Sequence, residues 1–266
     1  MTLPLKKNLI GVLIDGVDLF TATDMVMEAA HQRRALAVSA IAVHGVMTGV
    51  LDPTHRHRLN HLDLIVADGQ PVRWALNLLH HVGLRYRVYG PNLTAEVIAR
   101  AAPEKISVYF YGSSQGVLDR LCAKVQERFP GIQIAGAEPS RFGQITPQAA
   151  DEIAARIRKS GAGIVFAGLG CPRQEAWAYE FRDRLNIPIL AVGAAFPFLA
   201  GTLRMAPRWM QDRGLEWLFR LWSEPRRLWR RYLLLSPAYV LLVVCQAVGF
   251  RFTTEGKPPE EEVLFG

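Results

Sequence analysis

The stretch GIVFAGLGCPRQE (163–175) holds the unit from which most of the chain is built: a short apolar run, a glycine-rich turn and the polar start of a helix. Strands that are covered on both faces read as continuous apolar runs, and their alternation with helical patterns is typical of a parallel sheet. Similar runs are LIGVLI (9–14), ALAVSAIA (35–42), LDLIVA (62–67), ISVYFYG (106–112), IQIAGA (132–137) and IPILAVGA (187–194). The sequence therefore predicts an α/β fold with a mostly parallel sheet and helices on both faces.

The size and composition predict one substantial core with an appendage. The chain has 266 residues, of which 50% are hydrophobic, and this suits one α/β domain (1–200), a helical appendage (201–252) and a polar tail (253–266). Its three cysteines are far apart and show no metal-ligand spacing, which favours a reducing compartment. The first residues have no apolar core of a signal peptide, so we expect a cytoplasmic location. The tail ends in EVLFG, which resembles part of a protease site used to remove tags; its native or engineered origin stays open.

The segment RMAPRWMQDRGLEWLFRLWSEPRRLWRRY (204–232) concentrates the positive charge. With eight arginines and three acidic residues, residues 201–232 carry +5 of the chain's net charge of +7. Arginine pairs with phosphate oxygens and tryptophan settles at the headgroup level of a bilayer, so this mixture favours an anionic membrane surface. An amphipathic helix pair that caps a protein core is the alternative. Pro225 predicts a break between two helices, and the spacing of Arg227, Arg230 and Arg231 puts them on one face of the second.

An uncharged run of eighteen residues, 233–250, follows this basic segment. It is at the lower limit of what can span a bilayer, and Pro237 and Gln246 weaken a straight span. Interfacial or monotopic association is the favoured interpretation, and a true span or a buried core helix are the alternatives.

Several loops at expected strand ends carry residues that suit catalysis or phosphate binding. Asp68 follows an apolar run and precedes Gly69, where the chain can approach a ligand closely, so Asp68 is a candidate general base. The alternative is that Asp68 only caps a turn or helix. Turns after two other runs expose N–H groups that suit a diphosphate, and Gln174 and Glu175 are placed to reach the same cleft. The candidate residues in these two turns are Gly112, Ser113, Gly168, Gly170 and Pro172.

The sequence predicts no metal site. The chain contains no Asp-x-Asp clamp for a metal-bound nucleotide diphosphate, so arginines and helix N-termini would hold the leaving charge. His57 and His61 are four residues apart, but no third potential metal ligand stands at a sequence spacing that is typical of metal sites. Cys171 lies near an expected helix start, and a small packed residue is the favoured interpretation.

Five motifs occur in an order that resembles the WecG/TagA/CpsF glycosyltransferases, family 26. They are ADG followed by Trp (67–74), GPNL with Gly90 (90–93), GLGCPRQE (168–175), VGAAFPFLAG (192–201) and RMAPRWMQDRGLEWLFRLWSEPRR (204–227). The resemblance covers roughly residues 8 to 235 and implies a Rossmann-like core of the type called GT-E with a C-terminal appendage. It implies an inverting, metal-independent enzyme without cofactor, which moves a sugar from a UDP-sugar to a polyprenyl-diphosphate-linked saccharide at the cytoplasmic membrane face.

The resemblance also assigns roles to individual residues. Asp68 matches the family's proposed base and Gln174 its functional glutamine, while Arg220, Arg227 and Arg230 match arginines thought to meet the lipid diphosphate. His44 stands where many members have an active-site Asn, which leaves the donor sugar open among N-acetylmannosamine, its uronic acid and glucose. We expect the surrounding positive charge to lower the pKa of Asp68.

Two other classes of function remain as alternatives. A Rossmann-type oxidoreductase fits the alternation of strands and helices, but the full dinucleotide fingerprint is missing. A non-catalytic nucleotide-binding protein at a membrane surface fits the basic segment. No nucleic-acid partner is expected, and the sequence leaves open whether the chain forms a homo-oligomer.

Overall fold

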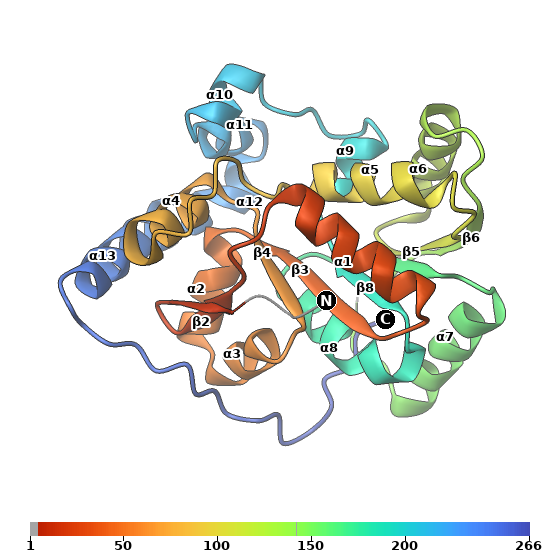
Figure 1. Ribbon diagram of the computed structural model, residues 1–266, viewed down its shortest axis with the longest axis horizontal. Helices are drawn as coiled ribbons and strands as arrows, with labels where there is room; N and C mark the ends of the chain where they lie inside the picture. Colours follow the sequence, from red (N-terminus) through yellow and green to blue (C-terminus); the bar gives the residue numbers. More distant parts are fainter. Residues whose placement is uncertain (1–4, 142) are drawn as a thin grey trace.

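A six-stranded parallel sheet lies at the centre of the protein, as the computed structural model shows (Figure 1). The structure describes residues 5–141 and 143–266, except for the side chains of Arg227, Arg230 and Arg231. The strand order is β4-β3-β8-β7-β5-β6, which confirms the predicted α/β class. The strands are β3 (Leu36–Ile41), β4 (Leu64–Ala67), β5 (Val108–Gly112), β6 (Ile134–Glu138), β7 (Ile164–Gly168) and β8 (Pro188–Ala191).

Helices cover both faces of the sheet because successive strand residues point to opposite sides. On one face Phe110 and Phe166 stack with ring centroids 5.6 Å apart, and Phe196 packs edge-on against Phe110. On the other face Tyr111 stacks on Trp177 at 4.9 Å. The first face carries α1 (Leu19–His31), α5 (Gly90–Ala101), α6 (Gln115–Arg128) and α9 (Ala195–Leu199). The second carries α2 (Val43–Leu51), α3 (Pro53–Asn60), α4 (Gln70–His80), α7 (Pro147–Lys159) and α8 (Arg173–Leu185).

The first apolar run does not join the central sheet, so this part of the strand prediction is wrong. Residues 9–14 instead contribute to an antiparallel hairpin of β1 (Lys7–Leu9) and β2 (Val12–Ile14). The turn lies at Ile10 and Gly11, whose φ angles are 46° and 94°. Such left-handed backbone is most easily adopted by glycine, and it reverses the chain within a run that reads as one strand.

The appendage consists of short helices that pack on the α/β domain near α4 (Figure 1). Its elements are α10 (Arg208–Asp212), α11 (Glu216–Ser223), α12 (Pro225–Arg230), the π-helix η1 (Arg231–Leu235) and α13 (Ser236–Ala247). The predicted break at Pro225 is confirmed, since α11 ends at Ser223 and α12 begins at this proline. In α13, Tyr239 and Val243 are buried, and the Tyr239 hydroxyl donates to the Pro71 carbonyl at 3.1 Å. None of the helices in the described ranges has the length and apolar character that a membrane crossing requires.

The tail after α13 runs back across the α/β domain and passes α3 (Figure 1), and its last residues contact the loop between β6 and α7. The Asn60 side chain donates to the Thr254 carbonyl at 2.8 Å, and the Ile145 N–H donates to the Leu264 carbonyl at 3.0 Å. Leu264 is only 2% exposed. Residues 253–266 therefore belong to the packed structure and are not a detached polar tail.

Gly112 provides a test of how closely the strand ends approach one another. Its φ is 112°, and an added Cβ would lie 2.8 Å from the backbone carbon of Gly168, so Gly112→Ala is expected to destabilise the fold by about 1–3 kcal/mol. Gly116→Ala is the matched control, because Gly116 lies in α6 with open space around its Cα. The control should be neutral or stabilising by up to about 1 kcal/mol. Urea unfolding of both variants measures this, and equal midpoints would contradict the close packing of the two glycine turns.

Candidate functional site

Asp68 lies directly after β4, at the edge of the sheet where all six parallel strands end. Ligands of open α/β sheets bind outside this edge. The Gly90 N–H, at the start of α5, donates to Asp68 Oδ1 at 3.2 Å. Gly69 is the N-cap of α4, and an added Cβ there would lie 3.4 Å from Ala42, just before α2. Asp68 is partly exposed as a residue, although its carboxylate is largely removed from water.

Glu216 of α11 brings the appendage into contact with this edge. Its carboxylate accepts from Arg87 Nη2 at 2.5 Å and from the Tyr89 hydroxyl at 2.9 Å. Arg87 lies over the Tyr89 ring with 4.1 Å between the guanidinium carbon and the ring centroid, and also donates to Gln211 Oε1 at 3.3 Å. Both partners of the ion pair have side chains that are only 12% exposed. The appendage is therefore part of the site.

Burial and nearby charges have opposing effects on the pKa values of Asp68 and Arg87. Burial raises the pKa of Asp68 to about 6, although attraction to Arg87, the Gly90 N–H and Arg220 all lower it, and repulsion by Glu216 adds to the increase. The expected low pKa is therefore wrong, because loss of water around the carboxylate outweighs the nearby positive charge. For Arg87, burial lowers the pKa, but attraction to Glu216 and Asp68 outweighs it, so the net shift is upward and the cation is retained.

Gln174 lies in the first turn of α8, next to the ends of β7 and β8. Its Oε1 accepts from the Gly170 N–H at 3.1 Å, and its Nε2 donates to Glu175 Oε1 at 2.9 Å. Gly193, with φ of 47°, makes room for it, because an added Cβ there would lie 2.6 Å from Oε1. Glu175 is 1% exposed and points beneath this edge, so it supports Gln174 from below and does not line the surface.

The other predicted donor residues lie along the same edge. Gly112 and Gly168 are paired in register at the ends of β5 and β7, and Ser113 follows with a φ of 62°. Gly170 and Pro172 form the turn before α8, where the peptide bond between Cys171 and Pro172 is cis. His44 lies in the first turn of α2, directly after β3. The two predicted glycine turns are thus neighbours in space.

The arginines of the appendage differ in how far they can be described. Arg220 lies over the Phe198 ring at 5.8 Å and is near enough to lower the pKa of Asp68, so the structure brings it to the site. The backbone of Arg227 and Arg230 belongs to α12, and that of Arg231 to η1. The side chains of these three residues lie outside the described part of the protein, and their predicted contact with a diphosphate remains a prediction.

The sequence did not predict Arg87, Tyr89 and Glu216 as residues of the site. Arg87 directly precedes the VYGPNL loop (88–93), and Glu216 is one of three acidic residues among eight arginines in residues 201–232. An acidic residue in such a basic segment was the available signal, because buried arginines need carboxylate partners.

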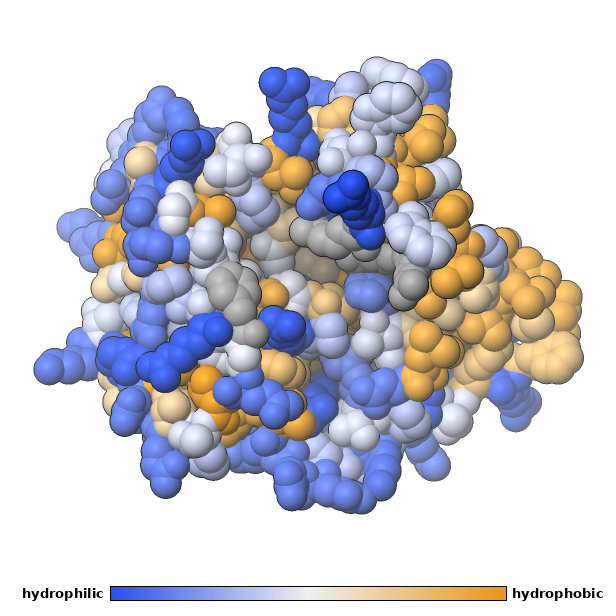
Figure 2. Space-filling view, turned by 180° about the vertical axis from the view of Figure 1, so that it is seen from behind, coloured by the Kyte–Doolittle hydropathy of each residue, from blue (hydrophilic) through white to orange (hydrophobic). Residues whose placement is uncertain are grey.

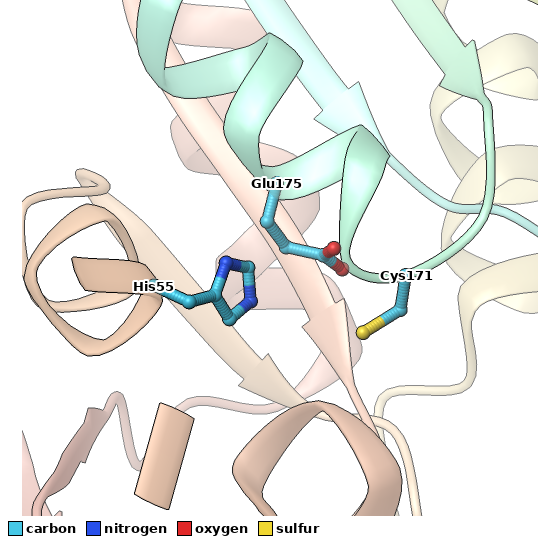
Figure 3. A group of neighbouring side chains, drawn as sticks. All are labelled: His55, Cys171 and Glu175. Atoms are coloured by element: carbon cyan, nitrogen blue, oxygen red, sulfur yellow. The ribbon is translucent and has the colours of Figure 1, made fainter. Parts of the chain in front are cut away.

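A further cluster lies below the edge, where His55, Cys171 and Glu175 come together (Figure 3). Their ligand atoms all lie within 4.8 Å of one another. His57 and His61, the pair singled out from the sequence, instead stack on each other with centroids 3.9 Å apart on α3. The interpretation of Cys171 as a small packed residue remains a prediction, and the structure adds that its sulfur lies beside two other potential metal ligands.

Comparison with known proteins identifies the family. Residues 7–252 match the model of the glycosyl transferase WecG/TagA/CpsF family. The chain is also 31% identical over 194 residues to the N-acetylglucosaminyldiphosphoundecaprenol N-acetyl-beta-D-mannosaminyltransferase of Bacillus spizizenii. That alignment covers 73% of this chain and 72% of the relative. With a sheet edge that gathers Asp68, Gln174 and Arg220, and a match over nearly its whole length, the chain belongs to the WecG/TagA/CpsF family of glycosyltransferases.

Proposed function

We propose that the protein transfers a sugar, with inversion, from a UDP-sugar to a saccharide linked to a polyprenyl diphosphate, and that Asp68 is the general base. The observation that carries the proposal is the position of Asp68 at the ligand-binding edge, where burial raises the pKa of its carboxylate to about 6. The family supports glycosyl transfer, and the name of the relative supports a lipid-diphosphate acceptor and an N-acetylmannosamine donor. Membership of this family replaces the oxidoreductase alternative.

In this mechanism Asp68 removes the proton from the acceptor hydroxyl as that oxygen attacks the anomeric carbon. The bond from this carbon to UDP breaks on the opposite side, which inverts the configuration. A carboxylate with a pKa of about 6 is largely ionised at neutral pH and yet more basic than an ordinary aspartate. Arg87, Arg220 and the N–H groups of the glycine turns would stabilise the departing diphosphate.

The appendage suits a peripheral or monotopic position on the cytoplasmic face of the inner membrane. Apolar residues gather on the protruding end of the molecule, where α13 lies beside α4 (Figure 2). The exposed members on these two helices are Trp74, Leu78, Val240, Leu241 and Val244. An exposed apolar surface next to an arginine-rich segment fits a bilayer that carries anionic headgroups. The lipid-linked acceptor would reach the site from this side.

Replacing the base is the first test of the mechanism. Asp68→Asn is expected to lower the transfer rate by about 10²- to 10⁴-fold, because the amide cannot accept the proton. Affinity for the UDP-sugar should remain nearly intact. UDP release with a lipid-linked acceptor measures transfer, and calorimetry measures donor binding. Asp119→Asn, at an exposed carboxylate on α6, is the control and should keep full activity. Near-wild-type turnover of the Asp68 variant would remove this residue from the mechanism.

The pH profile of the wild type gives an independent check of the same residue. Asp68 acts as a base only when it is deprotonated, so kcat/KM should fall about tenfold per pH unit below about pH 6 and level off above it. The Asp68→Asn variant should lack this dependence. A wild-type profile that stays flat down to about pH 4 would mean that burial does not raise the pKa of the base.

Transfer is expected to need no added Mg²⁺ or Mn²⁺, because the chain has no Asp-x-Asp clamp and offers arginines to the diphosphate. UDP release would be measured in EDTA with and without Mn²⁺, across UDP-linked N-acetylmannosamine, its uronic acid and glucose as donors. Loss of activity that Mg²⁺ or Mn²⁺ restores would contradict this prediction. Restoration by Zn²⁺ alone would instead implicate a site away from the diphosphate.

Membrane attachment and acceptor use should respond to different substitutions. The double variant Leu241→Ser with Val244→Ser should lower partition into anionic liposomes at least tenfold, since burying each side chain is worth about 1.5–3 kcal/mol. Phe20→Ser, at an exposed apolar residue on α1, is the control and should float like the wild type. Arg227→Ala with Arg230→Ala should raise the acceptor KM and keep flotation on liposomes of neutral lipid, where the two charges add no attraction. Unchanged flotation of the α13 variant would remove this helix from the membrane contact.

A further inference from the structure

The cluster of His55, Cys171 and Glu175 draws one residue from each of three parts of the fold. His55 is in the first turn of α3, Cys171 is in the turn between β7 and α8, and Glu175 is in the first turn of α8 (Figure 3). In Figure 3 the imidazole, the sulfur and the carboxylate converge on one space between α3 and α8. The cluster shares Glu175 with the predicted donor residues, but Glu175 is 1% exposed and lies below the surface of that edge.

Two polar atoms that face this space are buried without a hydrogen-bond partner. They are His55 Nε2, on a residue that is 3% exposed, and Glu175 Oε2, on a residue that is 1% exposed. The other carboxylate oxygen of Glu175 is satisfied by Gln174 Nε2 at 2.9 Å and by Ser39 Oγ at 3.2 Å. Buried polar groups in native proteins are nearly always paired, so two unpaired atoms aimed at one space point to a shared partner.

The chemistry of the donors indicates what that partner is. An imidazole nitrogen, a cysteine sulfur and a carboxylate oxygen form a ligand set that suits Zn²⁺ and similar transition metals, whereas Mg²⁺ and Ca²⁺ prefer oxygen alone. Tetrahedral zinc bonds of about 2.0–2.3 Å would separate the ligand atoms by roughly 3.3–3.7 Å. The present separations of up to 4.8 Å therefore need only a small inward movement of the side chains.

Neighbouring contacts hold the three ligands in place. The Asp52 side chain caps α3 and accepts from the His55 N–H at 3.1 Å. One turn further along α3, Arg58 forms a buried ion pair with Glu180 of α8 at 3.4 Å, which fixes the two helices against each other. Gly45 of α2 lies beside the sulfur, since an ideal Cβ there would be in ordinary van der Waals contact with Cys171 Sγ at 3.6 Å. The ligands thus lie on packed elements, which a metal site requires.

We propose that His55, Cys171 and Glu175 bind a zinc-type divalent cation that fastens the turn before α8 to α3. This site goes beyond glycosyl transfer, and the cation would not touch the donor diphosphate. It would act as a brace beneath the active-site edge. Through the hydrogen bond between Glu175 and Gln174, the brace would also hold the Gln174 amide in its orientation toward Gly170.

The test uses the full chain, stripped with a chelator, dialysed and titrated with Co²⁺ and then Zn²⁺. We expect one equivalent of Co²⁺ to give a thiolate-to-metal charge-transfer band in the near ultraviolet, and Zn²⁺ to displace it. Cys171→Ser should abolish the band, and His55→Gln should weaken Zn²⁺ binding at least tenfold. Cys122→Ser and His57→Gln are the matched controls, since neither residue belongs to the cluster, and both should behave like the wild type.

The outcomes separate this site from the proposed function. Circular dichroism first checks the fold of each variant, and if Cys171→Ser is unfolded, His55→Gln alone decides the question. The absence of a thiolate band in the wild type, or a band that persists in Cys171→Ser or disappears in Cys122→Ser, would overturn the proposal. Metal binding without glycosyl transfer would refute only the proposed function. Transfer by a chain that binds no metal would refute only the zinc site.

Discussion

The ion pair between Arg87 and Glu216 joins two parts of the protein that the chain separates by 129 residues. Arg87 precedes α5 at the sheet edge, and Glu216 belongs to the appendage. Removing one partner of a buried pair typically costs about 3–5 kcal/mol, so this contact holds the appendage against the sheet edge, where it forms a wall of the candidate site. Asp68 and Tyr89 both lie in the electrostatic field of this pair.

Competition between burial and charge determines how this site behaves. Counting charges alone would give Asp68 two nearby arginines and a low pKa. The same packing that brings Arg87 and Arg220 close also removes water from the carboxylate and adds Glu216, and these effects dominate. A group that is close to cations can therefore still become a stronger base when the appendage covers it.

Much of the fold could be predicted from local patterns. The apolar runs that became β3 to β8 are recognisable because strands buried on both faces need apolar residues at every position. The strand prediction for the first run, 9–14, was wrong because the turn at Ile10 and Gly11 depends on backbone angles that a hydrophobicity pattern does not reveal. The uncharged run 233–250 was expected at a membrane, but Tyr239 and Val243 pack on the protein while Leu241 faces outward. Hydrophobicity alone does not distinguish these two environments.

The candidate site was only partly predictable for a related reason. Asp68, Gln174 and the glycine turns occur at strand ends, which sequence patterns locate. Glu216 and the cluster of His55, Cys171 and Glu175 depend on which helices face each other, and no local spacing encodes this. Contacts between distant segments require the three-dimensional arrangement.

The contacts of the first hairpin with the end of α13 have a consequence for how the protein is made. The Ile10 N–H donates to Gln246 Oε1, and the Asn8 side chain donates to the Phe252 carbonyl, across 236 and 244 residues. Domains begin to fold while the chain is being synthesised, N-terminal parts first. The hairpin of β1 and β2 emerges early, yet it obtains these partners only after the residues up to Phe252 have left the ribosome. These hydrogen bonds of the hairpin can therefore form only after α13 has been synthesised and has docked on the α/β domain.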